Sequence, residues 1–146
     1  MPTSSQALDT RQLVKQYLHA LSARDVPALL ACFADTVDWN IPGVRELAPW
    51  LGPRHTRDEI ADFYAQLFEQ TEPVTAQLDY LVVDGPVAVV TGSFSTIMTR
   101  TNRLFSSHLC LQLVFEADKI THYRLFEDTL ALARALEVNP IAREQQ

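Results

Sequence analysis

The feature that most constrains the fold is a run of four long strand-like segments that are separated only by short turn signals. The segments span 74–83, 87–100, 103–116 and 120–127, and the turns are Asp84-Gly85-Pro86, Thr101-Asn102 and Ala117-Asp118-Lys119. Connections as short as these join antiparallel neighbours, so the four segments predict a β-meander. Long adjacent strands curl, and their apolar face requires a second layer of structure to cover it.

The residues before the meander supply helices for that layer. An apolar stripe predicts a helix over about 5–23, formed by Leu13, Val14, Tyr17, Leu18 and Leu21. Asp25 can cap a second, short helix, and Pro27 is tolerated in its first turn. The segment Thr56-Arg57-Asp58-Glu59 is a capping box, which predicts a third helix that ends near residue 70.

Three further segments complete the order. Residues 36–41 are expected to form a strand, 44–55 a loop that flanks the mouth of a cavity, and 129–136 a last helix capped by Asp128. The whole predicts an α+β fold: three helices packed on a strongly curved antiparallel sheet in a cone-shaped barrel, with a short C-terminal helix. By length, residues 1–146 are a single domain with a core of about 8–137 and flexible tails.

Composition and spacing exclude several functions. A formal net charge of -6 argues against nucleic acid as a partner, and the lack of a long apolar run argues against a membrane. The N-terminus has no signal-peptide pattern, so a cytoplasmic location is expected. Cys32 and Cys110 have no metal-binding spacing and are expected as buried free thiols. No HExxH or glycine-rich phosphate motif occurs, so we expect neither a metal nor a cofactor.

Strand alternation predicts which side chains face the interior. Alternate positions of two neighbouring segments form a mostly apolar row that we expect to face the interior: Val90, Phe94, Thr96, Met98, Phe105, Leu109, Leu111, Leu113 and Phe115. This pairing assumes a two-residue turn at Thr101-Asn102, and Tyr123 and Leu125 join the row if the last turn holds three residues. His108 then points outward, although the opposite register would turn it into the cavity. The outer face is mixed in polarity, which favours a homodimer interface there.

Three stretches resemble the SnoaL-like group of the nuclear transport factor two-like superfamily, which includes ketosteroid isomerases, polyketide cyclases and limonene epoxide hydrolase. They are YLHALSARDVPALLACFADTVDWNIPG, GPRHTRDEIADFYAQL and DKITHYRLFEDTLALARAL, and the resemblance covers about 8–137. It implies the cone fold, but the same cone hosts enzymes, binders and assembly domains. Members of the superfamily often pair through the outer sheet face.

The resemblance carries over only some catalytic residues. Tyr17 falls where ketosteroid isomerases place the tyrosine that stabilises an enolate, but their catalytic aspartate would fall near Trp39 or Asn40. Asn40 also coincides with an asparagine that holds the attacking water in the epoxide hydrolase. The acidic and basic triad of that enzyme would fall on the unsuitable residues Phe94, Thr96 and Leu125.

We therefore expect a hydrophobic small-molecule partner and, if the chain is an enzyme, a cofactor-independent isomerase or lyase. In that case Tyr17 would polarise a carbonyl oxygen, and Asp38 or Glu127 would move a proton. The expected substrate-binding residues are Trp39, Asn40, Phe63, Tyr64, Leu67, Phe94, Thr96, Met98, Leu109, Tyr123 and Leu125. The alternatives are a non-catalytic binder of a hydrophobic ligand and a dimerisation module whose interior is filled by its own side chains. A cavity of about 300 Å³ or more would argue against that module.

Overall fold

A computed structural model describes residues 9–137. Its helices are α2 (Thr10–Ser22), α3 (Val26–Ala31), α4 (Arg57–Gln70) and α5 (Thr129–Leu136). Its strands are β1 (Phe33–Ile41), β2 (Gly52–Thr56), β3 (Thr71–Asp84), β4 (Val87–Met98), β5 (Arg103–Glu116) and β6 (Lys119–Glu127). The predicted flexible tails and the predicted start of the first helix at residues 5–8 lie outside the described residues.

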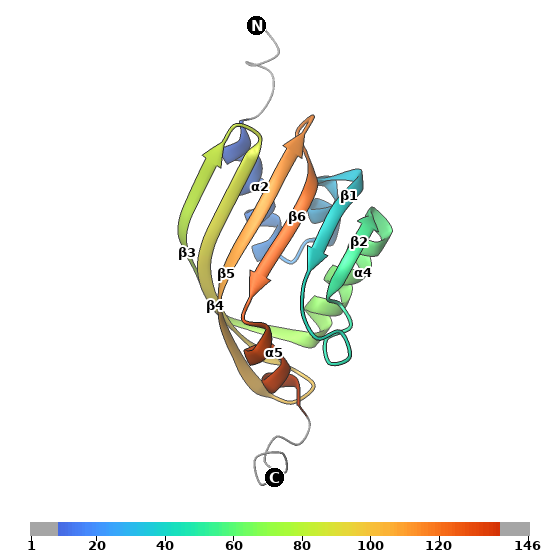
Figure 1. Cartoon of the computed structure of the whole chain (residues 1–146), viewed down its shortest axis with the longest axis vertical. Helices are drawn as coiled ribbons and strands as arrows, with labels where there is room; N and C mark the ends of the chain where they lie inside the picture. Colours follow the sequence, from blue (N-terminus) through green and yellow to red (C-terminus); the bar gives the residue numbers. More distant parts are fainter. Residues whose placement is uncertain (1–8, 138–146) are drawn as a thin grey trace, which may run out of the picture.

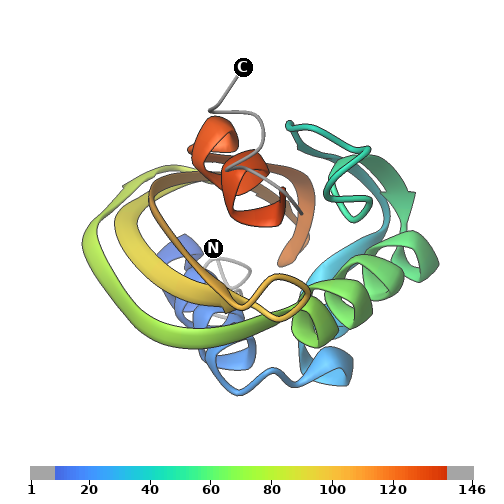
Figure 2. The same cartoon turned by 90° about the horizontal axis from the view of Figure 1, so that it is seen from below.

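The six strands form one sheet in the order β2-β1-β6-β5-β4-β3. Neighbouring strands are antiparallel except β1 and β6, which are parallel. Figure 1 shows the sheet in front of α2 and α4, and Figure 2 shows how strongly it curves around one side of the molecule. The predicted α+β cone is confirmed, although the sheet is not closed and has free edges at β2 and β3.

The predicted helix starts are present in the structure. Asp25 and Asp128 each accept a hydrogen bond from the backbone of the first turn that follows them. The capping box is complete, because the Thr56 hydroxyl accepts from the Glu59 backbone and the Glu59 carboxylate accepts from the Thr56 backbone. These local bonds satisfy backbone donors that the first turn of a helix leaves free. This is why the short polar motifs predicted the first residues of these helices correctly.

One segment differs clearly from the sequence-based expectation. The segment 44–55 is not only a loop, because β2 begins at Gly52 and pairs with β1. Trp50 and Leu51 in the same segment are buried, so this part of the chain packs into the core. Its two prolines obscured the strand, since Pro53 occurs in a short strand at the sheet edge, where a missing N–H is tolerated.

The two turns on which the predicted inner row depends have a different length from that expected, yet the row is preserved. Met98 pairs with Arg103, so the β4–β5 turn is two residues longer than expected, which leaves the parity of the side chains unchanged. Ala117 and Asp118, both with positive φ, form a two-residue β5–β6 turn instead of three. A bulge between Val114 and Phe115 shifts the register by one residue, and Tyr123 therefore still faces inward opposite Leu113.

The core lies between the concave sheet face and the helices. Its largest fully buried side chains are Trp39, Tyr17, Tyr64 and Phe33. Gly92 permits the close approach of β3 to β4, because a Cβ atom at this position would clash with the carbonyl oxygen of Gln77. The two cysteines are free, but both are half-buried rather than fully buried. Within residues 9–137, no helix is long and apolar enough to cross a membrane.

Candidate functional site

Three tyrosine hydroxyls converge in the core of the cone. The Tyr17 hydroxyl lies 2.7 Å from that of Tyr64 and 2.8 Å from that of Tyr123, and all three side chains are buried. They come from α2, α4 and β6, so the cluster ties both long helices to the sheet. Burial raises the pKa of Tyr17 and of Tyr64 well above the ordinary value, and that of Tyr123 to about 12. The three phenols therefore stay protonated at neutral pH.

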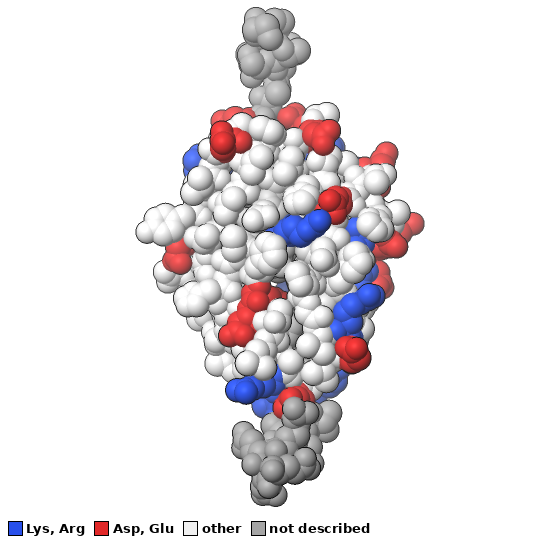
Figure 3. Space-filling model, viewed as in Figure 1, with Lys and Arg blue, Asp and Glu red and all other residues white. Residues whose placement is uncertain are grey.

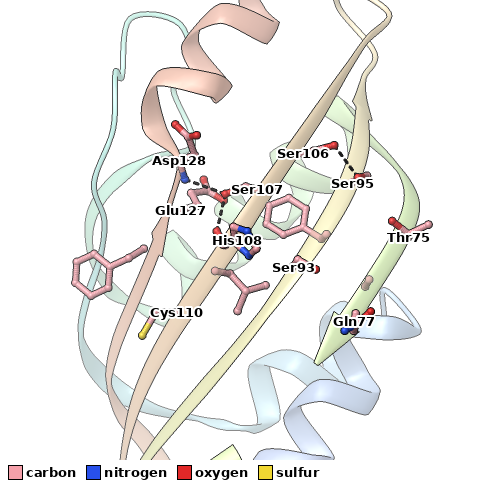
Figure 4. A pocket seen from close by; sticks show the side chains of 14 residues that line it. Thr75, Gln77, Ser93, Ser95, Ser106, Ser107, His108, Cys110, Glu127 and Asp128 are labelled. Atoms are coloured by element: carbon pink, nitrogen blue, oxygen red, sulfur yellow. Dashed lines mark hydrogen bonds between the residues drawn. The ribbon is translucent and has the colours of Figure 1, made fainter. Parts of the chain in front are cut away.

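A cavity of about 890 Å³ opens where β5 and β6 stop pairing (Figure 4). Phe94, Leu109 and Glu127 belong to the inward-facing rows and line it. Residues of the outward rows also line it, among them His108 and Cys110. The cavity therefore extends from the inner face of the sheet to its outer face. Most of the lining residues point to the outer face, so the cavity is a hollow that opens there, and its volume lies in the range of a ligand site.

Glu127 is the ionisable inward-facing residue of this cavity. It is the last residue of β6 and pairs with Leu109, four positions after Tyr123 on the same strand face. Among residues 9–137, no side chain or backbone group makes a hydrogen bond or ion pair with its carboxyl group. Burial raises the pKa of Glu127 to about 7. Both protonation states are therefore populated near neutral pH, as a general acid or base requires.

Ser107 fixes the backbone next to this carboxyl group. Its hydroxyl accepts a hydrogen bond of 2.8 Å from the backbone N–H of Asp128 and donates one of 2.5 Å to the carbonyl of His108. Figure 4 shows both bonds: the first joins Asp128, which follows β6, to β5, and the second lies within β5. Asp128 itself caps α5, as predicted, through a bond of 2.9 Å to the Ala131 backbone. The hydrogen bonds of Ser107 and Asp128 thus fix the backbone next to Glu127, whose side chain lines the cavity.

Asp38 does not lie at the cavity, contrary to the sequence-based expectation. Its carboxylate is 62 % exposed, makes an ion pair of 2.8 Å with Arg124 and lies 3.5 Å from Nδ1 of His122. The hydrogen bond from Arg124 lowers the pKa of Asp38. The reason is strand alternation: the apolar ring of Trp39 takes the inward position of β1, which turns Asp38 and Asn40 to the other face. The predicted position of Asn40 in the cavity is therefore wrong as well.

The other predicted site residues divide into two groups. Phe94 and Leu109 line the cavity with Glu127. The rest lie in or against the core and do not line this cavity: Tyr17, Trp39, Phe63, Tyr64, Leu67, Thr96, Met98, Tyr123 and Leu125. Two of them carry buried polar atoms without a hydrogen-bond partner in the described part of the chain, namely Trp39 Nε1 and Thr96 Oγ1. Such atoms are rare in folded proteins and are candidates for ligand contacts.

Sequence reasoning missed the serine residues of the cavity. Ser93 and Ser95 on β4, with Ser106 and Ser107 on β5, all line it. Ser95 and Ser106 lie opposite each other, and their hydroxyls share one hydrogen bond of 2.7 Å, which leaves one hydroxyl proton to be donated elsewhere. Pairs of serines at facing positions of two neighbouring strands were the available signal, but the correct register was needed to recognise it.

A second hollow of about 490 Å³ lies beside α2, α3 and the β5–β6 turn, and Lys119 at its edge donates to the Ala31 carbonyl. No group of three or more His, Cys, Asp or Glu side chains could hold a metal ion in the described range 9–137.

Comparisons with known proteins agree with this architecture. A sequence profile of the SnoaL-like domain matches residues 14–123. An NTF2-like protein from Burkholderia xenovorans LB400 is 29 % identical, with a TM-score of 0.79 over 88 % of this chain and 95 % of that chain. A putative isomerase from Rhodopseudomonas palustris is 20 % identical, with a TM-score of 0.78 over 84 % and 94 % of the two chains.

A more distant structure is that of an LEH-like epoxide hydrolase from M. tuberculosis. It is 14 % identical, with a TM-score of 0.68 over 93 % of this chain and 95 % of that chain. At such identities the isomerase and the hydrolase share the fold with this chain, and their chemistry does not follow from the likeness. No protein of curated function matches the sequence.

Proposed function

Because the chain belongs to the SnoaL-like domain family, we propose that it binds an apolar carbonyl compound and catalyses proton transfer on it through Glu127. The observation that carries this proposal is the Glu127 carboxyl group. It lines the cavity of about 890 Å³, has no hydrogen bond or ion pair within residues 9–137, and has a pKa raised to about 7. A group poised near neutral pH both accepts and returns a proton readily.

The proposed step is the removal of a proton from the carbon next to a carbonyl group. The ionised Glu127 carboxylate takes this proton, and the electron pair of the broken C–H bond moves into an enolate. Return of the proton to a different carbon of a conjugated enolate isomerises the substrate. Loss of a β-hydroxyl group, which leaves as water with the proton held by Glu127, gives dehydration. Attack on a second carbonyl group of the same molecule gives cyclisation, and the new alkoxide takes that proton. None of these steps consumes an oxidant, a reductant or a second substrate.

The cavity wall offers groups for the other parts of such a substrate. Phe94 and Leu109 present apolar surface next to Glu127. The Ser95 and Ser106 hydroxyls point to the outer face, so their one remaining proton is suited to a polar group of the ligand there and not to the carbonyl group beside Glu127. Tyr17 was the donor expected from the sequence, and for that role a ligand has to replace one of its two hydroxyl partners.

The test is the exchange of α-protons of 2-tetralone, an apolar ketone, in D2O, followed by proton NMR. We expect exchange above the buffer rate, with a rate that rises with pH through about 7 as Glu127 ionises. The substitution Glu127→Gln should lower the protein-dependent rate by about 100-fold or more.

Asp38→Asn is the matched control, since it removes an exposed carboxylate that is already paired with Arg124. It should leave the exchange rate unchanged. If the Glu127→Gln variant exchanges protons as fast as the original protein, or if the protein adds nothing to the buffer rate, Glu127 is not the base for this class of substrate.

A non-catalytic binder is the second candidate function. The observation that favours it is the presence of Thr96, Phe94 and Leu125 where the resemblance to the epoxide hydrolase implies its ionisable triad. For a binder, 2-tetralone should raise the midpoint of thermal unfolding equally in the original protein and in Glu127→Gln, without any proton exchange.

A further inference from the structure

We propose that the outer-face part of the Glu127 cavity binds the sugar ring of a neutral glycoside, while the apolar part of the same ligand lies against Phe94 and Leu109. This inference adds a hydroxyl-rich substituent to the apolar compound of the proposed function, and it rests on that function only for the direction in which the ligand lies. The sugar site itself is formed by side chains that the proposed proton transfer does not use.

The outer face of the sheet carries two rows of polar side chains at the cavity, and each row crosses three strands. Ser95 pairs with Ser106, Ser93 pairs with His108, and β3 adds one residue to each row. The rows are Thr75-Ser95-Ser106 and Gln77-Ser93-His108, and all six residues line the cavity (Figure 4). Because neighbouring strands lie about 4.8 Å apart and alternate residues of one strand about 6.7 Å apart, the rows cover about 10 Å by 7 Å. A single sugar ring with its hydroxyls fits this area.

Much of the hydrogen-bonding capacity of these rows is unused. Within residues 9–137, three of the six side chains make no hydrogen bond, namely Thr75, Ser93 and His108. Gln77 makes one, from its amide nitrogen to Asp79, and the facing serines of the first row keep one hydroxyl proton to donate. Hydroxyl, amide and imidazole side chains supply both donors and acceptors, and the hydroxyl groups of a sugar require both.

The charges around the rows favour a neutral ligand over an anionic one. No lysine or arginine among residues 9–137 lines the cavity, whereas Glu127 and Asp128 do. Figure 3 shows the surface over β3, β4 and β5 almost entirely white, with charged side chains toward its margins and over β6. A phosphate or carboxylate group would therefore lack a positive partner in the cavity, and the formal net charge of -6 would repel it.

Phe126 supplies the apolar contact that a sugar ring also requires. It pairs with Cys110, one row beyond His108, lines the cavity and is 42 % exposed. One face of a pyranose ring presents C–H groups, which pack on an aromatic ring while the hydroxyls at its edge make hydrogen bonds. The group attached to the sugar then contacts Phe94 and Leu109, which belong to the inward-facing rows. The cavity thus has a suitable wall for each half of an aryl glycoside.

The test compares the affinities of three probes that share one aromatic group: 2-naphthyl β-D-glucopyranoside, 2-naphthol and 2-naphthyl phosphate. None of them has a carbonyl group, so their binding does not depend on proton transfer by Glu127. Isothermal titration calorimetry at about pH 7 measures the dissociation constants. We expect the glucoside to bind about tenfold more tightly than 2-naphthol, because several hydrogen bonds are added, and the phosphate to bind more weakly than either.

Ser93→Ala and His108→Ala are the variants that test the rows. Each removes a side chain that makes no hydrogen bond within residues 9–137, so the folded protein loses no internal bond, and each variant serves if the other does not fold. Either substitution should weaken binding of the glucoside about fivefold to tenfold and leave the affinity for 2-naphthol unchanged. Ser22→Ala is the matched control, because it removes an exposed hydroxyl at the end of α2, away from the cavity, and it should change neither affinity.

Equal affinities for the glucoside and 2-naphthol would overturn the proposal, as would tighter binding of the phosphate or a glucoside affinity that neither variant changes. A homodimer paired through the outer face would cover both rows, so exclusion of the glucoside by such a dimer would overturn it too. Failure of the proposed function gives a different result: the glucoside binds and responds to Ser93→Ala, but 2-tetralone exchanges no protons.

Discussion

The Trp39 indole stacks face to face on the Tyr123 phenol, with ring centroids 3.9 Å apart and ring planes 7° apart. Trp39 also contacts Phe33, Phe63 and Tyr64, so a single side chain of β1 joins the sheet to α4. The parallel pairing of β1 with β6 brings the two stacked residues side by side. Both rings are buried on the inward face of the sheet.

Trp39→Ala should lower the free energy of unfolding by about 3–5 kcal/mol, because a large buried ring is lost and a cavity remains. Urea unfolding, followed by circular dichroism, measures the difference. Leu130→Ala is the control, since Leu130 is 60 % exposed on α5, and its effect should stay within about 0.5 kcal/mol. Equal effects of the two substitutions would contradict the central place of Trp39 in the core.

Tyr17→Phe should lower the free energy of unfolding by about 1–3 kcal/mol, because it removes a hydroxyl that binds Tyr64 and Tyr123 and leaves theirs buried. The same urea titration applies. Tyr80→Phe removes the hydroxyl of an exposed tyrosine and should have almost no effect. If Tyr17→Phe is as mild as Tyr80→Phe, the cluster does not contribute to stability.

The fold was predictable because its signals are local. Capping residues such as Asp25 and Thr56, and turns such as Ala117-Asp118, act within a few residues of their own position. The predicted inner row is correct although two turn lengths were wrong. The β4–β5 turn is longer by two residues, which keeps the alternation of side chains, and the bulge near Val114 compensates for the shorter β5–β6 turn. Because a one-residue slip would turn the apolar face of a strand toward solvent, burial of that face fixes the register of pairing.

The candidate site was only partly predictable, because it depends on where distant segments meet. Parity placed Phe94 and Leu109 on the inner face, and both line the cavity, as does Glu127, which was expected to move a proton. The alternation of side chains alone did not predict whether Asp38 or Trp39 faces inward. Trp39 faces inward because its large indole ring is the side chain that must be buried. The place where β5 and β6 separate, and with it the cavity mouth at Ser106 and His108, has no sequence signal of its own.

Asp38→Asn should reduce stability above about pH 4 and leave it unchanged at lower pH. The hydrogen bond from Arg124 lowers the pKa of Asp38 in the folded protein, so the folded state favours the ionised form more than the unfolded chain does. This contribution is present above the unfolded pKa and is lost as the pH falls through the folded one. Because the carboxylate is largely exposed, the effect should be small and should shrink further at high salt. Urea midpoints at pH 2.5 and pH 6 give the comparison, and a constant difference would contradict it.

Glu127→Gln should change stability with the opposite dependence on pH. Burial raises the pKa of Glu127 from 4.5 to about 7, so the folded protein holds more protons than the unfolded chain between these values. The free energy of unfolding of the original protein should therefore fall as the pH rises from about 4.5 to 7, relative to the variant. A shift of this size corresponds to a change on the order of 3 kcal/mol.

Urea unfolding of both proteins at pH 4.5 and pH 8 measures this difference. The free energy of unfolding of Glu127→Gln, relative to that of the original protein, should be higher at pH 8 than at pH 4.5. Asp38→Asn should show no such rise, because the pKa of Asp38 is lowered and not raised. A pH-independent difference between Glu127→Gln and the original protein would mean that water or a counter-charge reaches the carboxyl group. Its pKa would then be ordinary, and the reason to regard it as an acid or base at neutral pH would be lost.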